Sequence, residues 1–344
     1  MTDAGKGEFD LIRRHFAARR TADARVLLGI GDDCALLAAP EAGQVLAVSS
    51  DMLVEGRHFF AGTDPASVGH KTLAVNLSDL AAMGAEPLGF TLSIALPVVD
   101  DDWLRAFCDG LFALAARARC PLVGGDTTRG PLCLSVTVFG QVPAAQAFRR
   151  SGARVGDDLW VSGPLGGAAL AVARRAAGSP VPADAARCLD WPEPRLALAR
   201  ALRGLAKAAI DISDGLAGDL THVLVASGCS GARIERARVP LAPALGGAAP
   251  VAPSHAEAPA DAGASAGPAP DADDAIRFAL DGGDDYELLF AADPADRETV
   301  AALRPEGTPA PVRIGTVSGD LGILLVGSDG ATRRWQPNGF DHFR

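Results

Sequence analysis

The sequence has 344 residues, which is longer than one compact core usually requires and is typical of two domains. Hydrophobic residues make up 48% of the chain and charged residues 22%, a balance that excludes a chain dominated by disorder. The formal net charge is −10 and no cluster of lysine and arginine is present, so we expect no nucleic acid partner. An acidic protein of this kind needs cations to handle phosphates.

No targeting or membrane segment is expected from the sequence. The N-terminal residues lack the apolar stretch of a signal peptide, and no run of about 18 apolar residues exists. The six cysteines form no paired motif, which favours reduced thiols over a zinc site or a disulfide framework. We therefore expect a cytoplasmic protein without a membrane partner. The cysteines are Cys34, Cys108, Cys120, Cys133, Cys188 and Cys229.

In the first half of the chain, strands and helices are predicted in alternation. Residues 26–60 are expected to form a strand, a Gly-Asp turn, a second strand at Val45–Val48 and a loop. Asp64 and Pro65 are an N-cap and a first helical residue, and Gly84 suits the helix end. The elements expected next are a strand over 90–96, a helix over about 103–114, a turn at GGDTTRG and a strand over 132–142.

The second half begins after a polar stretch near residues 145–158, so we predict domains at 1–148 and 149–344. A strand is expected over 158–162, helices over about 167–177 and 194–206, and a strand, turn and helix over 208–227. Residues 242–274 contain mainly Ala, Pro, Gly and Asp. Such a segment buries too little surface to offset its ordering entropy, which predicts a disordered insertion. The alternation of elements favours mixed α/β domains.

The common phosphate-binding and kinase motifs are absent. No GxxxxGK[ST] loop occurs, neither HRD nor DFG is present, and the chain has only three lysines. Any phosphoryl transfer by this chain must therefore depend on metal ions and arginine.

Aspartates beside glycines or hydroxyl residues recur at five predicted strand ends. A single Asp in a turn is explained by helix capping or by a hydrogen bond to its own backbone. Five such turns favour a site in which carboxylates hold Mg²⁺ and glycines let the backbone approach a polyphosphate. Asp79 adds a carboxylate from a helix, one turn after Asn76. The five segments are Gly31–Asp33, Ser49–Asp51, Gly124–Asp126, Asp211–Gly215 and Gly282–Asp285.

Eight motifs in order resemble those of the thiamine-monophosphate kinase family, from about Gly7 to Phe343. The resemblance implies an α+β, two-domain fold like that of aminoimidazole-ribonucleotide synthetase, with a dimerising sheet in the N-terminal domain and a C-terminal α/β domain. It also implies a homodimer that transfers phosphate from ATP to thiamine phosphate with several Mg²⁺ ions, the last step of thiamine diphosphate synthesis. The motifs are GIGDDCALL, SSDMLVEGRHF, NLSDLAAMGAEP, GGDTTRGP, RSGARVGD, AIDISDGLAGDL, GGDDYELLF and NGFDHF.

The same resemblance assigns roles to residues of this chain. It implies Mg²⁺ ligands at Asp33, Ser49, Ser50, Asp51, Asp79, Asp126, Asp211 and Asp214. It implies ATP contacts at Gly125, Asp126, Arg150 and Ser213, and thiamine phosphate contacts at His58, Asp284 and Phe340. Ser50 stands where the family commonly has Thr, and Asp284 where it commonly has Glu. Tyr286, the only tyrosine, lies in a strand-like YELLF segment and is predicted to belong to the core.

No residue is assigned as a general base. The acceptor is itself a phosphate with a second pKa near about 6, so at neutral pH it attacks as a dianion. We expect direct in-line transfer without a phosphoenzyme, in which the site supplies positioning and charge stabilisation. His58 is expected to contact the substrate, held in its protonated form by the nearby acidic residues.

Two alternatives remain at this stage. Another enzyme of the same superfamily with a different acceptor is one, although this chain ends in His342-Phe343-Arg344 and lacks a reactive C-terminal Cys. Selenophosphate synthetase, another member of the superfamily, usually has a nucleophilic Cys or selenocysteine near its N-terminal Gly-rich loop. The earliest cysteine of this chain, Cys34, follows the Asp32-Asp33 pair, where that nucleophile is not expected. The second is a nucleotide-binding protein without catalysis, for which so many repelling carboxylates have no use.

Overall fold

The protein was analysed as a computed structural model that describes residues 8–19, 23–247 and 270–338. Internal contacts divide the chain into two units. The N-terminal unit holds residues 1–80 and 85–145, and the C-terminal unit holds residues 81–84 and 146–344. Within the described residues, no helix has the length and apolar character needed to cross a membrane. The predicted substrate residue Phe340 lies outside the described residues.

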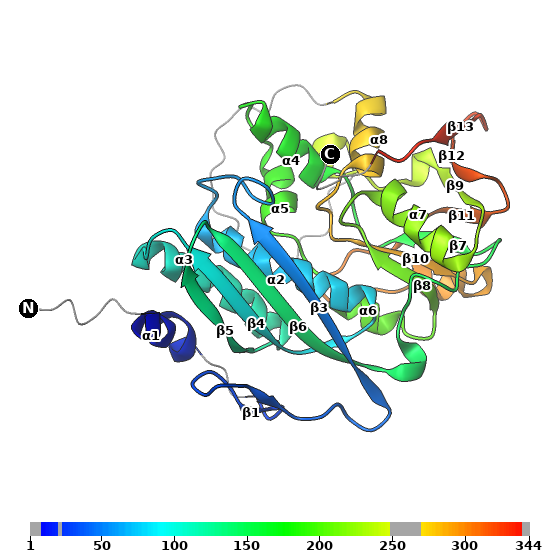
Figure 1. Cartoon of the computed structure of the whole chain (residues 1–344). Helices are drawn as coiled ribbons and strands as arrows, with labels where there is room; N and C mark the ends of the chain where they lie inside the picture. Colours follow the sequence, from blue (N-terminus) through cyan, green and yellow to red (C-terminus); the bar gives the residue numbers. More distant parts are fainter. Residues whose placement is uncertain (1–7, 20–22, 248–269, 339–344) are drawn as a thin grey trace, which may run out of the picture. The chain divides into compact units, whose positions relative to one another are not determined.

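The N-terminal unit is built around a four-stranded sheet in the order β3-β6-β4-β5 (Figure 1). Strands β4 and β5 are parallel, and the other neighbours are antiparallel. The elements of this unit are α1 (Glu8–Leu11), a π-helical turn (Ile12–Phe16), a 3-10 turn (Ala17–Arg19), β1 (Val26–Leu28), β2 (Leu36–Leu37), β3 (Gln44–Val54), α2 (Pro65–Ala82), β4 (Glu86–Leu96), α3 (Asp101–Ala118), β5 (Leu122–Arg129) and β6 (Cys133–Pro143).

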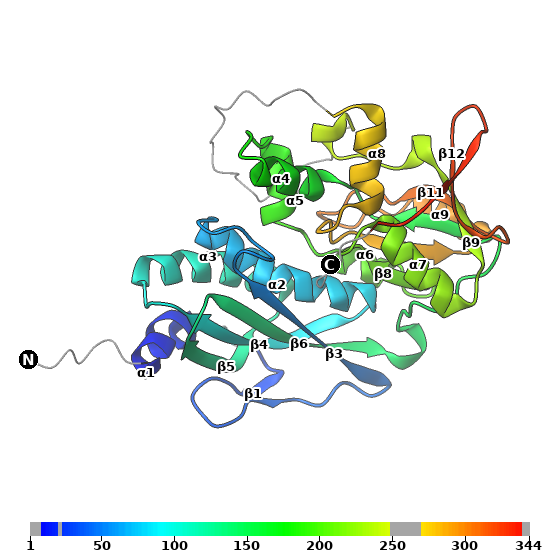
Figure 2. The same cartoon turned by 45° about the horizontal axis from the view of Figure 1, so that its top comes forward.

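Helix α2 begins where the sequence predicted. The Asp64 carboxylate accepts a hydrogen bond from the Ser67 amide at 3.1 Å, and Pro65 is the first helical residue. Helices α2 and α3 cover one face of the sheet (Figure 2). Their apolar residues, such as Leu77 and Phe107, are fully buried, as are Phe90 and Leu134 of the strands. This layer of helices on a sheet forms the core of the unit.

Two segments that were predicted as turns or loops are strands. Strand β3 does not stop at Val48 but continues to Val54, and the GGDTTR segment lies within β5. Strand β3 pairs with β6 along its full length, from Gln44 opposite Pro143 to Val54 opposite Cys133. The ladder uses only backbone groups, so tertiary pairing outweighs the low strand preference of Gly and Asp.

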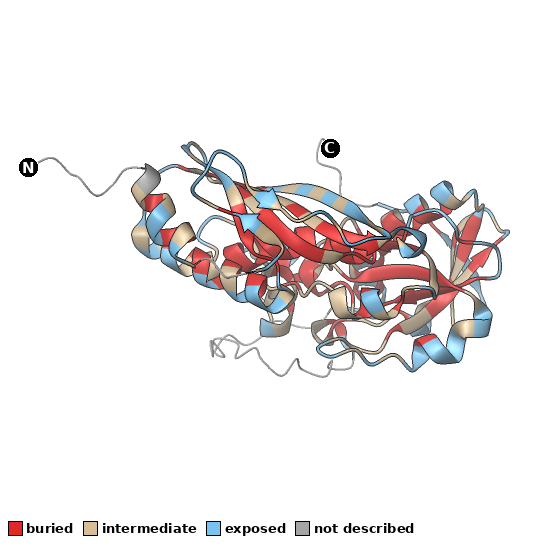
Figure 3. Cartoon of the chain, turned by 90° about the horizontal axis from the view of Figure 1, so that it is seen from below, coloured by how far each residue is buried: buried red, intermediate tan, exposed pale blue. Residues whose placement is uncertain are grey.

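The register of the sheet separates its residues into two faces. Directly paired residues share a face, and successive residues alternate. Asp51 is paired with Val136, a buried residue on the side of the helices. Met52 belongs to the opposite face and is 55% exposed. Figure 3 shows exposed positions along the edge strand β3, beside buried strands. The side chains of β3 therefore point alternately toward the helices and away from them.

The C-terminal unit contains a seven-stranded sheet in the order β13-β12-β9-β11-β7-β10-β8, antiparallel except for β12 and β9. Its apolar core gathers residues from these strands and from helices α7 and α8, including Leu159, Ile210 and Leu220. The main elements are β7 (Asp158–Val161), α4 (Gly167–Ala176), α5 (Ala183–Asp190), α6 (Leu196–Ala201), β8 (Ala206–Asp211), α7 (Leu216–Ser227), β9 (Gly231–Glu235), α8 (Ala272–Asp281), β10 (Leu288–Ala292), α9 (Arg297–Ala301), β11 (Val312–Ser318), β12 (Gly322–Val326) and β13 (Thr332–Trp335).

The α+β architecture with two units confirms the predicted fold class. Several local predictions for the C-terminal unit need correction. Helix α5 was not predicted, and the helix expected over 194–206 spans only Leu196–Ala201. The predicted disordered insertion at 242–274 is wrong at both ends. Leu245 is buried in a 3-10 turn, and α8 begins at Ala272 behind the N-cap Asp271. Residues 248–269 of the insertion lie outside the described residues.

Candidate functional site

In the N-terminal unit, the predicted ligands of β3 meet those of α2. The Ser49 hydroxyl donates a hydrogen bond to the Asp79 carboxylate at 2.5 Å. The Asp51 amide donates to the Asn76 side-chain oxygen at 3.0 Å. Asn76 is buried and also donates to the Thr72 carbonyl, which fixes its orientation. The strand and the helix thus hold Ser49, Asp51 and Asp79 in one place.

The chemistry of this group fits Mg²⁺. Burial, and then the charge of Asp79, raise the pKa of the Asp51 carboxyl to about 6. Two carboxylates that disfavour each other's ionisation, together with a hydroxyl oxygen, form the kind of hard oxygen set that binds Mg²⁺. A bound cation would relieve the repulsion between them.

Ser50 and Asp126 lie on the other face of the sheet. The Ser50 hydroxyl donates to the Val136 carbonyl at 3.0 Å and lies 3.1 Å from the Thr137 hydroxyl. Asp126 is paired with Ser93, in register with the exposed Met52. Since β3 and β5 are the two edges of the sheet, three strand spacings of about 4.8 Å separate them, roughly 14 Å. Within one N-terminal unit the predicted ligands therefore form two groups rather than one.

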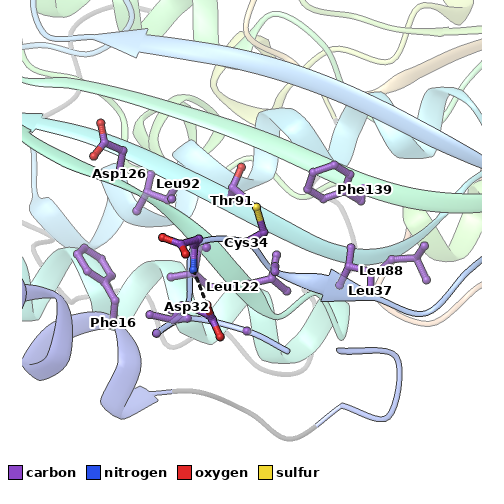
Figure 4. Close-up of a pocket in the computed structure, with 18 of the residues that line it drawn as sticks. Phe16, Asp32, Cys34, Leu37, Leu88, Thr91, Leu92, Leu122, Asp126 and Phe139 are labelled. Carbon is purple, nitrogen blue, oxygen red and sulfur yellow. Dashed lines mark hydrogen bonds between the residues drawn. The ribbon is translucent and has the colours of Figure 1, made fainter. Parts of the chain in front are cut away.

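A cavity of about 1140 Å³ in the N-terminal unit is lined in part by Asp33, Gly125 and Asp126. In Figure 4, Asp126 lies at one end, and Leu37, Leu88 and Phe139 lie at the other. Asp33 is exposed in the turn before β2, and its amide donates to the Asp32 carboxylate at 2.9 Å. The cavity thus has an acidic part and an apolar part, and its size is sufficient for a nucleotide.

Gly125 occupies a position that only glycine fits. Its φ is +150°, and a Cβ at this residue would lie 1.8 Å from the Leu92 carbonyl oxygen. The missing side chain allows β5 to pass close to the Leu92 backbone of β4 beside Asp126. The Asp126 carboxylate itself accepts a hydrogen bond from the Thr127 amide at 2.9 Å.

His58 is held in a single tautomer by the loop after β3. Its Nδ1 accepts a hydrogen bond from the Val54 amide at 3.0 Å. A nitrogen that accepts carries no proton, so the ring is neutral and its Nε2 bears the hydrogen. The expectation of a protonated His58 is therefore wrong. His58 nevertheless has no free basic nitrogen, because one nitrogen is engaged and the other is protonated.

In the C-terminal unit, Asp211 is the last residue of β8, and Ser213 and Asp214 lie in the loop between β8 and α7. The buried carboxylate of Asp219, on the first turn of α7, accepts hydrogen bonds from the Ser213 and Asp214 amides at 3.1 and 3.2 Å. Burial, followed by the charge of Asp214, raises the pKa of Asp219 to about 7, while the two amide bonds and Arg150 act in the opposite direction. This electrostatic coupling places Arg150 near the loop.

The segment with Asp284 packs against the same loop. The Asp284 amide donates to the Ser213 carbonyl at 2.9 Å, and the Tyr286 amide donates to the Ile212 carbonyl at 2.8 Å. Ser213, Asp214 and Asp284 are therefore neighbours. Tyr286 precedes β10 and is partly exposed, with its hydroxyl bonded to Asp284 at 3.0 Å, so its prediction as a core residue was wrong.

No single cluster of all predicted ligands is preformed. Within the residues that the structure describes, no group of three or more His, Cys, Asp or Glu is close enough to hold a metal ion. The structure instead brings together Ser49, Asp51 and Asp79, then Asp33, Gly125 and Asp126, and finally the loops of Asp214 and Asp284.

Sequence reasoning missed the residues that hold the C-terminal loops. Asp219 lies within the motif AIDISDGLAGDL, and a carboxylate in the first turn of a predicted helix is a signal for capping of the preceding loop. Tyr286 gave no such signal, because its role depends on a backbone conformation that the sequence does not encode in a simple pattern.

Comparisons with known proteins show which family the chain resembles. Residues 31–142 match the family described as AIR synthase related protein, N-terminal domain. The chain is 43% identical over 343 residues to the thiamine-monophosphate kinase of Salmonella typhimurium, with 98% of each chain covered.

Two solved structures extend the comparison to the fold. The thiamine-monophosphate kinase of Stenotrophomonas maltophilia has a TM-score of 0.78 and 42% identity, covering 95% of this chain and 98% of the other. AaThiL complexed with AMPPCP and TMP has a TM-score of 0.71 and 27% identity, covering 100% and 99%. The fold, the arrangement of the carboxylates and this similarity over nearly the full length lead to one conclusion: the chain belongs to the thiamine-monophosphate kinase family.

Proposed function

We propose that this protein transfers the γ-phosphoryl group of ATP to thiamine phosphate and so produces thiamine diphosphate and ADP. The proposal is based on two observations together. Acidic groups are present on β3 and α2, in the cavity and on the C-terminal loops. The chain is also 43% identical to a thiamine-monophosphate kinase. The relative AaThiL is complexed with AMPPCP, an analogue of ATP, and with TMP.

ATP binds in part at the cavity of the N-terminal unit. The apolar end of the cavity, with Leu37, Leu88 and Phe139, suits a purine base. The acidic end of the cavity, at Asp126, suits phosphates neutralised by metal ions. Gly125, which lines the cavity beside Asp126, is a further proposed ATP contact. Arg150 and Ser213 are the proposed ATP contacts of the C-terminal unit.

Mg²⁺ is held by Ser49, Asp51 and Asp79 on the helix side of the sheet, and by Asp33 and Asp126 at the cavity. Ser50 contributes less directly, because its hydroxyl points to the opposite face from Ser49. Asp211 and Asp214 are the proposed ligands of the C-terminal unit. When bound, the ions neutralise the charge of the two phosphates and allow them to approach each other.

The chemical step needs no proton transfer. An oxygen of the thiamine phosphate dianion forms a bond to the γ-phosphorus, and the bond from that phosphorus to the β,γ-bridging oxygen breaks, so ADP leaves with the electron pair. His58 donates from Nε2 to the acceptor rather than accepting a proton, because its Nδ1 is engaged by the Val54 amide. Asp284 and Phe340 contact the acceptor. The residues of the site supply positioning rather than acid–base chemistry.

The N-terminal unit also suits a homodimer. Strand β3 is an edge strand whose outward side chains include Leu46 and Val48, which are 51% and 55% exposed, and Met52 at 55%. An apolar edge of this kind favours association with a second copy. We assign ATP and Mg²⁺ binding and dimerisation to residues 1–148 and the second domain to 149–344. The protein acts in the cytoplasm, where ATP is made.

The decisive test is an incubation of the full chain with ATP, Mg²⁺ and thiamine phosphate, followed by quantification of thiamine diphosphate and ADP. Equal amounts of the two products are expected, and no product is expected with unphosphorylated thiamine. An Asp51→Asn, Asp79→Asn double variant serves as the matched control for contaminating kinases. Absence of thiamine diphosphate would remove the proposal.

The in-line step has its own test. ATP made chiral at the γ-phosphorus with oxygen isotopes and sulfur is used as donor, and the configuration of the thiamine diphosphate analogue is determined. A single direct displacement inverts the configuration. Net retention would demonstrate two displacements and hence a phosphoenzyme, which contradicts direct transfer.

A further inference from the structure

The backbone between the β8–α7 loop and β10 is strained at two neighbouring positions. Asp284 and Tyr286 have φ values of +66° and +48°. Among the described residues the third non-glycine residue with positive φ is Arg119, which follows the end of α3, where a left-handed residue is common. A bulky residue such as tyrosine rarely adopts this conformation, so the segment requires an explanation.

The strained segment is fixed at three points within the C-terminal unit. The Asp284 and Tyr286 amides donate to the Ser213 and Ile212 carbonyls. Between them, the Asp285 carboxylate accepts the Gly166 amide with both oxygens, at 2.9 and 3.1 Å. The preceding Gly283 lies so close to the β8–α7 loop that a Cβ there would be 2.3 Å from the Ser213 carbonyl oxygen.

These anchors determine where the side chains go. Asp285 is turned toward the start of α4, while the Tyr286 hydroxyl donates to the Asp284 carboxylate oxygen Oδ1 at 3.0 Å. With the left-handed backbone at both residues, the tyrosine hydroxyl reaches the carboxylate two residues before it. The strain thus produces one geometric result, a carboxylate oriented by a tyrosine hydroxyl.

We propose that Tyr286 is a positioning residue for the phosphoryl acceptor: its hydroxyl fixes Asp284 so that this carboxylate faces the cationic ring portion of thiamine phosphate. The inference rests on the proposed contact between Asp284 and thiamine phosphate. The hydroxyl holds the Asp284 oxygen Oδ1 and so sets the orientation of the carboxylate relative to the acceptor. Asp284 is one methylene shorter than the glutamate common in the family, and a fixed orientation compensates for part of the lost reach.

The first test is kinetic. Tyr286→Phe removes one oxygen atom and should raise the KM for thiamine phosphate about tenfold, the size expected for one hydrogen bond to a charged group, with the KM for ATP unchanged. In an Asp284→Ala background the same change should have no further effect, because Tyr286 acts through Asp284. Thr221→Val, which removes a hydroxyl bonded to the Ala217 carbonyl on α7, is the matched control and should leave both KM values unchanged.

The outcomes separate this inference from the proposed function. If the wild-type chain makes no thiamine diphosphate, the proposed function fails and this inference falls with it. If the wild-type chain is active but Tyr286→Phe leaves the KM for thiamine phosphate unchanged, only the inference is overturned. An equal rise in both backgrounds overturns it too, since Tyr286 would then act independently of Asp284.

A second measurement begins with the wild-type chain. Because Tyr286 is the only tyrosine of the chain, fluorotyrosine labelling gives a single ¹⁹F resonance. That resonance should shift when thiamine phosphate binds, and the Asp284→Ala variant should lose the shift. A resonance that is identical with and without saturating thiamine phosphate in the wild-type chain overturns the proposal.

Discussion

The candidate carboxylates of the N-terminal unit that meet on the helix side stand on regular elements, whereas Asp214 and Asp284 of the C-terminal unit stand on loops. Asp51 and Asp79 are positioned by a regular strand and a regular helix. Asp214 and Asp284 are positioned by side chains and strained backbone around them. The first arrangement brings like charges together on a rigid frame, and the second depends on supporting residues such as Asp219 and Tyr286.

The largest effect on turnover is expected when Asp51 or Asp79, on the strand and helix of the N-terminal unit, loses its charge. Asp51→Asn and Asp79→Asn should each lower turnover by about 100-fold or more, since each removes a proposed metal ligand. The melting temperature without Mg²⁺ should stay the same or rise, because burial of the charge and then its repulsion by Asp79, which together raise the pKa of Asp51, no longer oppose folding. Turnover and thermal melts with and without Mg²⁺ provide the check.

Near-normal turnover of both variants at ordinary Mg²⁺ concentration would contradict the assignment of this group. A large fall in melting temperature would instead show that the carboxylates stabilise the unit, which is the opposite of the role argued from their repulsion.

A smaller loss of activity is expected when the β8–α7 loop, which holds Ser213 and Asp214, loses the Asp219 carboxylate that supports it. Asp219→Ala leaves the Ser213 and Asp214 amides without their acceptor, which costs about 1–3 kcal/mol for a buried donor. We expect a rise in the KM for ATP of about tenfold and a lower melting temperature. Asp219→Asn keeps an acceptor oxygen and should have a smaller effect on both. If the two variants behave alike, the amide bonds are not what positions the loop.

The same contrast explains what the sequence predicts and what it does not. The capped start of α2 and the Ser49–Asp51 motif are local patterns, so their elements and the chemistry of the acidic residues were predictable. The extension of β3 to Val54 was not, because it depends on pairing with β6, which is remote in sequence. The role of Tyr286 depends on φ angles imposed by three tertiary contacts, which no local pattern shows.

A smaller and sharper effect is expected at two adjacent serines. Ser49→Ala removes a hydroxyl bonded to Asp79 and should raise the Mg²⁺ concentration needed for half-maximal turnover by about tenfold. Ser50→Ala removes a hydroxyl that lies on the opposite face of the sheet and bonds the Val136 backbone carbonyl. This variant should change the required Mg²⁺ concentration little. Titration of turnover with Mg²⁺ compares the pair. A larger effect at Ser50 would contradict the assignment of the helix side of β3 as the metal-binding side.

The smallest effect on catalysis is expected at Asp158, an acidic residue of the C-terminal unit that directly follows the motif RSGARVGD and has no predicted role in the site. Its fully buried carboxylate accepts from Arg313 Nε at 2.6 Å and from Arg297 Nε at 2.7 Å. Burial alone would raise the pKa of Asp158, but the hydrogen bonds from Arg297 and Arg313 lower it below its ordinary value of 3.8. Asp158→Asn should leave turnover and both KM values unchanged and should destabilise the fold. The cost should fall below the about 3–5 kcal/mol typical of a broken buried ion pair, because the Arg297 side chain is 50% exposed.

The pH dependence of that destabilisation follows from the lowered pKa. Below its ordinary pKa of 3.8 the carboxyl is protonated in the unfolded chain, whereas the folded chain still holds it ionised. The stabilisation is therefore complete above about pH 5 and is lost as the pH falls toward the folded-state pKa. The difference in the free energy of unfolding between the wild-type chain and Asp158→Asn should be largest near neutral pH and should shrink below about pH 4. Urea unfolding at several pH values measures it. A difference that grows on acidification would mean that folding raises the pKa of Asp158, and the two arginines would then not be the groups that hold this carboxylate ionised.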